Sequence, residues 1–341
     1  MQSREIIGKV LSYGHPPRIG WGLKDPRYND FTGDGTDNLE DFDYAWHPSR
    51  EFEDFYPILK GFKGYARHDE FGNLWGKVET DPSVMGEVLK GAMDDWDQLD
   101  SYRLPDFTSA DRYRSAEKSI RDNPGKYRIG YLPGFPFSIM RKIRKMEYFL
   151  SDLILEKDNV MALNSRVLGM LSDMISHFGE MGMDAVMFCE DWGTQHSLLI
   201  SPGLWREIFK PGFAILCTHA KEYGMKIFMH SCGYIYEILD DLIEVGIDVF
   251  QFDQPTLMGM EKVAEKFKKG KVTLFASCDI QRILPSGDKE LIQHHARELI
   301  RLFASGGGGF IARDYGDYPT IQVSGHSVRW MHEVFVKEGV F

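Results

Sequence analysis

Short apolar runs alternate with longer amphipathic segments over the last two thirds of the chain. The apolar runs predict strands, and the segments between them have the 3.6-residue period of helices, as at 201–224, 234–246 and 288–307. Strict alternation of this kind is typical of parallel βα units. It predicts an α/β protein with a (β/α)8 TIM-type barrel, in which six strands are legible at 127–134, 184–193, 226–233, 247–255, 271–279 and 309–314.

The N-terminal third has no sustained period. Residues 25–52 are rich in Asp, Gly and aromatic residues, and residues 67–78 read as a small hairpin. One or two further strands are expected in this third. We therefore expect a single barrel domain over residues 1–341, in which 1–110 form an irregular N-terminal extension and the first elements and 111–341 form the main βα units. An open doubly wound sheet is the alternative, but no Gly-rich dinucleotide fingerprint follows any strand.

Composition narrows the function classes. Hydrophobic residues make up 43% of the chain, enough for a large core, and the formal net charge of −11 argues against nucleic acid as the main partner. No apolar run is long enough to cross a membrane and no signal peptide is evident, so the expectation is a cytoplasmic protein without a membrane partner. The four cysteines form no spaced pair, which favours free thiols or metal ligands over disulfides.

A histidine and a cysteine, separated by a single residue, lie at the end of the predicted strand at 226–233. Residues i and i+2 of a strand point the same way, so His230 and Cys232 are expected to project together from its C-terminal end. Imidazole and thiolate are both good zinc ligands. Cys278 at the end of a neighbouring strand is the candidate third ligand, although the pleat lets either Cys278 or its neighbours Ser277 and Asp279 face inward.

Five consecutive predicted strands end in ionisable residues, where a barrel of this kind carries its chemistry. Carboxylates at these ends could act as proton donors or could orient metal ligands. The candidate catalytic residues are Glu190, Asp191, Asp253, Asp279 and Asp314. Side chains that could line a pocket for an aromatic or flat ligand are Trp192, Gln195, Gln254 and Tyr315.

The stretches "EDWGTQHSLLISPGLWREIFKP", "GMKIFMHSCGYIYEILDDLIEVGIDVFQFDQP" and "CDIQRILPSGDKELI" resemble the uroporphyrinogen decarboxylase superfamily, with a likeness from about residue 65 to the C-terminus. The resemblance implies a (β/α)8 barrel with its active-site cleft at the strand C-termini. It also implies one of two chemistries. One branch holds metal-free decarboxylases of tetrapyrroles with an arginine-rich N-terminal segment, which this chain lacks. The other holds zinc-dependent corrinoid methyltransferases with a His-x-Cys pair, matched here by His230 and Cys232.

The third zinc ligand departs from that branch. Its members carry a Cys-Gly near the last strand, where this chain has "ARDYGDYP" with Tyr315 at or beside the cysteine position. Cys278 could substitute, or Asp314, Asp253 or Glu190 could ligate, or no zinc binds. An oxygen ligand would make the metal a stronger Lewis acid and a poorer holder of thiols.

The resemblance therefore favours a methyltransferase that takes a methyl group from a small donor, such as an aromatic methyl ether, and passes it to a separate corrinoid (cobalamin-type) protein. The alternatives are a metal-free decarboxylase, for which Arg18, Arg141 and Arg313 are the available basic residues, and a barrel that binds a tetrapyrrole without catalysis. Assembly as a homodimer stays open.

Overall fold

Eight parallel strands form a nearly closed barrel in this protein, for which a computed structural model describes residues 1–78 and 86–341. The strands follow one another around the barrel in the order β1, β12, β11, β10, β9, β8, β7 and β2. The TIM-type barrel is therefore confirmed, and the two strands expected in the N-terminal third are β1 and β2. The barrel strands are β1 (Gly20–Gly22), β2 (Phe31–Asp34), β7 (Tyr127–Tyr131), β8 (Ala185–Cys189), β9 (Lys226–His230), β10 (Val249–Phe252), β11 (Thr273–Ala276) and β12 (Phe310–Arg313).

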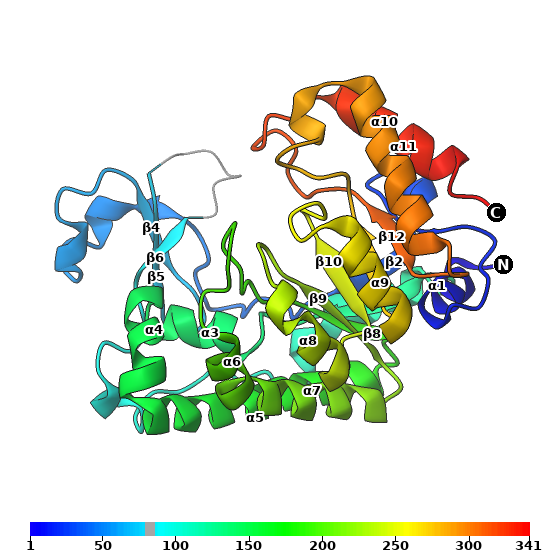
Figure 1. Cartoon of the computed structure of the whole chain (residues 1–341). Helices are drawn as coiled ribbons and strands as arrows, with labels where there is room; N and C mark the ends of the chain where they lie inside the picture. Colours follow the sequence, from blue (N-terminus) through cyan, green and yellow to red (C-terminus); the bar gives the residue numbers. More distant parts are fainter. Residues whose placement is uncertain (79–85) are drawn as a thin grey trace.

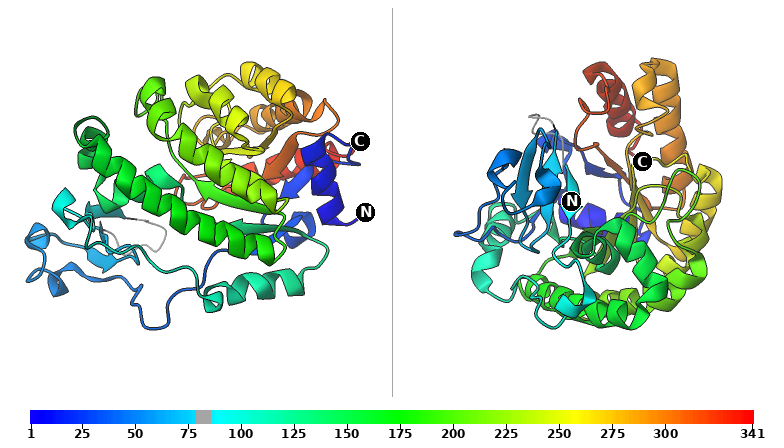
Figure 2. Two further views of the ribbon diagram at one scale, coloured as in Figure 1. Left: turned by 90° about the horizontal axis from the view of Figure 1, so that it is seen from below. Right: turned by 90° about the vertical axis from the view of Figure 1, so that its left-hand side faces the viewer.

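Helices cover the outside of the barrel, and they are more numerous than the sequence pattern indicated (Figures 1 and 2). The segment between β7 and β8 holds three helices, and Lys145, between the first two, has a positive φ of 61°. The segment 201–224 forms two helices, with Pro211 in the first turn of the second. The helices are α1 (Ser3–Ser12), α2 (Arg114–Asp122), α3 (Pro136–Ile143), α4 (Met146–Leu155), α5 (Lys157–Glu180), α6 (Pro202–Ile208), α7 (Lys210–Glu222), α8 (Leu239–Val245), α9 (Met260–Gly270), α10 (Lys289–Leu299) and α11 (Gly325–Lys337).

β1 and β2 stand at the two ends of the strand order, and the side chain of Asp30 links them. The connection between these strands holds a single 3-10 turn (Pro26–Tyr28) in place of a full helix, and Asp30 within it is almost fully buried. Its carboxylate accepts hydrogen bonds from the Trp21 N–H (2.8 Å) and from the Arg18 guanidinium (2.7 and 2.8 Å). A buried, paired carboxylate thus joins the first and second strands.

Helix α1 closes the N-terminal end of the barrel. Its apolar residues Ile6, Ile7, Val10 and Leu11 pack in one cluster with inward-facing strand residues such as Phe228 and Phe275. The end of the barrel opposite α1 carries the loops that follow each strand, and this end is where the candidate site residues were expected.

The N-terminal extension contains a small antiparallel sheet that lies beside α3 and α4 (Figure 1). The hairpin predicted at 67–78 is confirmed as the pairing of its second and third strands. The chain after this sheet runs tightly against the end of α3, where the Met93 N–H donates to the Ile143 carbonyl (3.0 Å). The strands of the small sheet are β3 (His47–Pro48), β4 (Tyr65–His68), β5 (Leu74–Lys77) and β6 (Glu87–Lys90).

Among the described helices, none combines the length and the apolar character needed to cross a bilayer. The two ends of the chain lie close together (Figure 1), and Arg18 forms a bridge with Val340.

Candidate functional site

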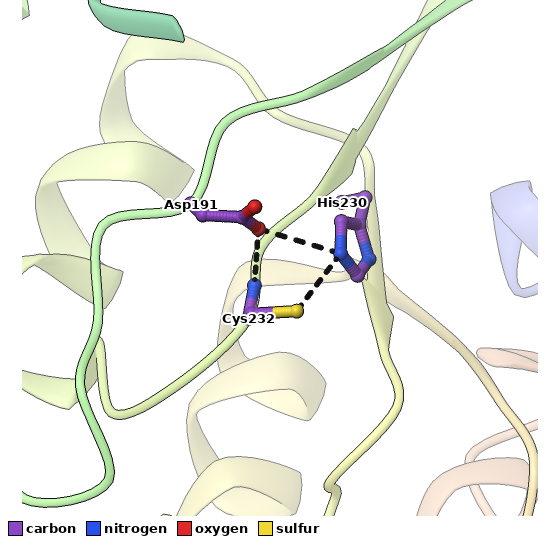
Figure 3. A group of neighbouring side chains, drawn as sticks. All are labelled: Asp191, His230 and Cys232. Atoms are coloured by element: carbon purple, nitrogen blue, oxygen red, sulfur yellow. Dashed lines mark hydrogen bonds and ion pairs between the residues drawn. The ribbon is translucent and has the colours of Figure 1, made fainter. Parts of the chain in front are cut away.

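Three ligand-type side chains meet at the C-terminal end of the barrel (Figure 3). His230 ends β9, Cys232 follows it, and Asp191 comes from the loop after β8. His230 Nε2 lies 3.2 Å from Cys232 Sγ and 3.4 Å from Asp191 Oδ1, and one ligand atom from each residue falls within 4.8 Å of the others. The expectation that His230 and Cys232 project together thus agrees with their placement here.

Two glycines hold the loops of this group against each other. A Cβ atom on Gly233 would lie 2.1 Å from the Gly193 carbonyl oxygen, and one on Gly193 would lie 2.4 Å from Tyr234 N. The contact is fixed by hydrogen bonds across the loops, since the Tyr234 N–H donates to the Thr194 carbonyl (2.7 Å). Gly233 also has a φ of 79°, which only glycine adopts freely. The close approach of these backbones brings Asp191 to the His-x-Cys pair.

The group is electrostatically coupled in the absence of a ligand. Burial lowers the pKa of His230, but its hydrogen bonds to Asp191 and Cys232 outweigh burial and raise that pKa well above the usual value. Burial raises the pKa of Asp191, but its partners His230, the Cys232 N–H and Arg141 outweigh this and lower it to about 2. The Cys232 N–H donates to Asp191 Oδ1 at 2.8 Å. Asp191 is therefore a carboxylate over the ordinary pH range.

Glu190 points away from this group, although it is the neighbour of Asp191. Its fully buried carboxylate accepts hydrogen bonds from the backbone N–H groups of Phe137 (2.9 Å), Ser138 (3.0 Å) and Phe135 (3.3 Å) at the N-terminus of α3. Burial raises the pKa of Glu190 to about 8, while these donors and the nearby Arg141 act in the opposite direction. Glu190 therefore anchors a helix end.

Cys278, the expected third metal ligand, is not brought to the group. It is fully buried, its Sγ lies 3.6 Å from the Ile292 carbonyl of α10, and its N–H faces the sulfur of Met331 in α11. The chain after β11 thus directs Cys278 outward to the helices. Asp191, which we expected to orient ligands or to donate protons, is the third ligand-type side chain beside His230 and Cys232.

Trp192 does not line a pocket. It is fully buried, stacks on Phe137 with ring centroids 4.2 Å apart, and contacts Trp205 and Phe209 edge-on. The expected role of Trp192 in ligand binding is wrong for this reason. Its packing instead fixes the backbone beside Asp191.

The other three candidate carboxylates have local partners. Asp253 is buried, accepts a hydrogen bond from Gln251 (2.8 Å) and lies 3.5 Å from the Arg313 guanidinium. Asp279 accepts backbone N–H bonds from Gln281 and Arg282, both at 2.9 Å, as the cap of a turn. None of these partners belongs to the His230 group, although the charge of Asp253 helps to raise the pKa of His230.

Asp314 forms a separate buried cluster. It accepts hydrogen bonds from His332 Nε2 (2.6 Å), the Tyr318 hydroxyl (2.7 Å) and the Lys24 N–H (2.6 Å). Burial alone would raise the pKa of Asp314, but these donors lower it below its usual range. The cluster ties the loop after β12 to α11 and to the loop after β1.

Three expected pocket residues lie at the mouth of the barrel. Gln195 and Gln254 approach each other across the loops after β8 and β10, with Nε2 and Oε1 3.5 Å apart. Tyr315 is partly buried in the loop after β12. A narrow hollow beside Cys232 is lined by Gln254 and Asp253.

Sequence reasoning gave little weight to Arg141. Its guanidinium lies 3.9 Å from Asp191 Oδ2, and its charge acts on both Asp191 and Glu190. The stretch "RKIRK" was visible in the sequence, but it reads as a solvated helix face. Only the packing of α3 against the loop after β8 brings Arg141 to the group.

Comparisons with known proteins agree with this architecture. The uroporphyrinogen decarboxylase (URO-D) family model matches residues 77–313. A methyltransferase from Methanosarcina mazei has a similar structure, with a TM-score of 0.59 and 17% identity over 75% of this chain and 73% of that chain. A D-psicose 3-epimerase from Clostridium cellulolyticum H10 is more distant, with a TM-score of 0.41 and 8% identity over 72% of this chain and 86% of that chain. No curated protein sequence is similar enough to this chain to count as a match. The family match covers more than half of the chain, and the chain therefore belongs to the uroporphyrinogen decarboxylase family.

Proposed function

We propose that this protein is a zinc-dependent methyltransferase that moves a methyl group between a small donor and a separate corrinoid protein. The observation that carries the proposal is the meeting of Asp191, His230 and Cys232 at the barrel mouth. The fold likeness to a methyltransferase from Methanosarcina mazei is compatible with it. So is the His-x-Cys pair, which resembles the zinc ligands of the corrinoid methyltransferase branch.

The donor set fits zinc. Zinc is bound by imidazole nitrogen, thiolate sulfur and carboxylate oxygen, and a site with three protein ligands keeps a position open for a substrate. His230 Nε2 faces both other ligand atoms, whereas its Nδ1 is buried without a partner in the described part of the chain. His230, Cys232 and Asp191 would hold the ion. When bound, zinc would act as a Lewis acid on an oxygen or sulfur atom of the donor.

The residues of the chain itself pre-organise this donor set. Asp191 accepts the Cys232 N–H, which fixes the two ligand-bearing loops relative to each other before any ion binds. The oxygen ligand replaces a second sulfur, which leaves more positive charge on the ion. This favours a methyl ether over a thiol as the group that zinc would activate. The nearby Arg141 offers a cation to a negatively charged part of the donor.

A metal-free decarboxylase is the second candidate, and one observation favours it. Two guanidinium groups, those of Arg141 and Arg313, lie at the barrel mouth within 4.0 Å of carboxylates. The same groups could bind the carboxylates of an acidic substrate. In that case the His230 group would act as an ion cluster without zinc.

The zinc content of the purified protein separates the two candidates. We expect about one zinc per chain by plasma mass spectrometry after purification without chelator, and none in the His230→Ala, Cys232→Ala double variant. Asp191→Asn should retain the fold and weaken zinc binding by roughly 10- to 100-fold in a chelator competition. Methyl transfer from aromatic methyl ethers to a corrinoid protein would then be assayed. If the wild-type protein still contains no zinc after incubation with zinc ions, the proposal is refuted. Decarboxylation is then the function to test.

A further inference from the structure

A hollow of about 260 Å³ lies between the small sheet and the barrel. Residues just after the C-terminal ends of β2 and β7 form part of its wall. The hollow therefore opens at the same end of the barrel as the His230 group. The volume is just below the usual range of ligand pockets and suits a molecule with one ring. The lining residues that matter for the argument are Thr36, Asn38, Phe71, Phe107, Pro133 and Lys142.

Lys142 brings an amino group into this hollow that forms no ion pair with any of the described residues. Within the described ranges, no carboxylate oxygen lies at ion-pair distance from its Nζ, which lies 5.8 Å from the ring centre of Trp75. Burial and the nearby charge of Arg141 lower the pKa of Lys142, whereas the charge of Asp69 acts in the opposite direction. A cation in such surroundings gains more from an anionic ligand than a solvated surface lysine does.

The two carboxylates that line the hollow already accept hydrogen bonds from other residues. Asp69 accepts hydrogen bonds from the Asn73 N–H (2.9 Å), the Asn73 side chain (2.9 Å) and Trp75 Nε1 (2.7 Å). Glu70 pairs with Arg112 at 2.7 Å and accepts the Tyr44 hydroxyl. Glu70 is thus balanced by Arg112, whereas Asp69 acts on Lys142 through its charge without forming an ion pair with it.

The remaining walls suit a flat apolar body. Phe71 and Phe107 face each other with ring centroids 6.4 Å apart, and Pro133 and Ile139 add aliphatic surface. Aromatic rings pack favourably at such distances. The hollow thus combines the Lys142 amino group, beside the Arg67 guanidinium in the same lining, with two aromatic rings.

We propose that this hollow binds a small aromatic acid, with Lys142 as the cation that holds its carboxylate. Lys142 is the sequence neighbour of Arg141, whose guanidinium lies 3.9 Å from Asp191 Oδ2, so the hollow and the candidate metal group both border α3. The identification of this acid as the methyl donor rests on the proposed function; its binding to the hollow does not.

Benzoate is the probe, and isothermal titration calorimetry on the full chain measures its binding. Lys142→Met should weaken benzoate by at least about tenfold, because a charge-assisted hydrogen bond is lost. Lys118→Met is the matched control: it removes the same charge from the exposed end of an ion pair on α2 and should change binding by less than about twofold. Benzyl alcohol, which has the ring without the charge, should bind weakly and equally to all three proteins.

The wild-type protein gives a second readout that does not depend on the folding of a variant. Saturating benzoate should protect Lys142 from acetylation by acetic anhydride, followed by peptide mass spectrometry, and should leave Lys118 unprotected. Equal benzoate affinity in Lys142→Met, or unchanged acetylation of Lys142, would overturn the proposal. Loss of benzoate binding in the His230→Ala, Cys232→Ala variant alone would also overturn it, since the carboxylate would then bind at the metal group. Lys142-dependent binding in a protein that takes up no zinc would refute the proposed function and leave this inference standing.

Discussion

The contact between Gly193 and Gly233 gives the sharpest test of how the candidate site is built. In Gly233→Ala the new methyl group would lie 2.1 Å from the Gly193 carbonyl oxygen, whereas ordinary van der Waals contact begins at 3.4 Å. A left-handed φ of 79° costs a residue with a Cβ about 1–2 kcal/mol, and relief of the overlap costs about 1–3 kcal/mol more. The free energy of unfolding should therefore fall by about 2–5 kcal/mol.

The same substitution should loosen the donor set. The two loops must separate to accept the methyl group, and this draws Asp191 away from the Cys232 N–H. We expect zinc affinity to fall by roughly 10- to 100-fold, as for other losses of ligand orientation. Urea unfolding and a zinc competition with a chromogenic chelator measure the two effects.

Gly169→Ala is the matched control. Gly169 lies on the exposed side of α5, where an added Cβ has no neighbour within 4 Å. Alanine there should leave zinc binding unchanged and should stabilise the helix by about 0.4–1 kcal/mol. If Gly233→Ala unfolds at the same urea concentration as the wild type, the glycine contact does not position the loops and the reasoning fails.

Three further predictions concern single side chains of the barrel and its loops. Asp30→Ala should lower the free energy of unfolding by about 3–5 kcal/mol in urea titrations, because it leaves the buried Arg18 unpaired at the barrel seam; an unchanged midpoint would mean that the seam does not depend on this pair. Cys278→Ala should keep the full zinc content and lose about 1 kcal/mol of stability, whereas zinc loss would restore Cys278 as a ligand. Folding of the metal-free protein lowers the pKa of Asp191 from 3.8 to about 2. The ionised carboxylate therefore stabilises the fold fully above pH 3.8, and this stabilisation is lost as the pH falls toward 2. Asp191→Asn should remove that part of the acid sensitivity, and a series of unfolding curves between pH 2 and 5 would contradict this if both proteins lose stability equally.

Much of the fold was readable from the sequence because strand and helix periods are local properties. Six barrel strands lie within the predicted runs, and His230 and Cys232 lie together, although β9 ends at His230 and the loop after it places Cys232. The helix boundaries were less accessible. The break before α7 is marked in the sequence by Pro211, whereas Lys145, a residue that rarely adopts a positive φ, gives no local sign of the break before α4.

The composition of the candidate site was decided by tertiary structure. The sequence alone determined that ionisable residues end five consecutive strands, and so that chemistry would gather at one end of a barrel. It could not determine which carboxylate or thiol reaches His230, because neighbouring residues at a strand end face different surroundings. Glu190 binds the N-terminus of α3, Cys278 packs on α10, and Asp191 reaches the group only because two glycines allow their loops to touch. That contact joins segments about 40 residues apart, and no local pattern of the chain encodes it.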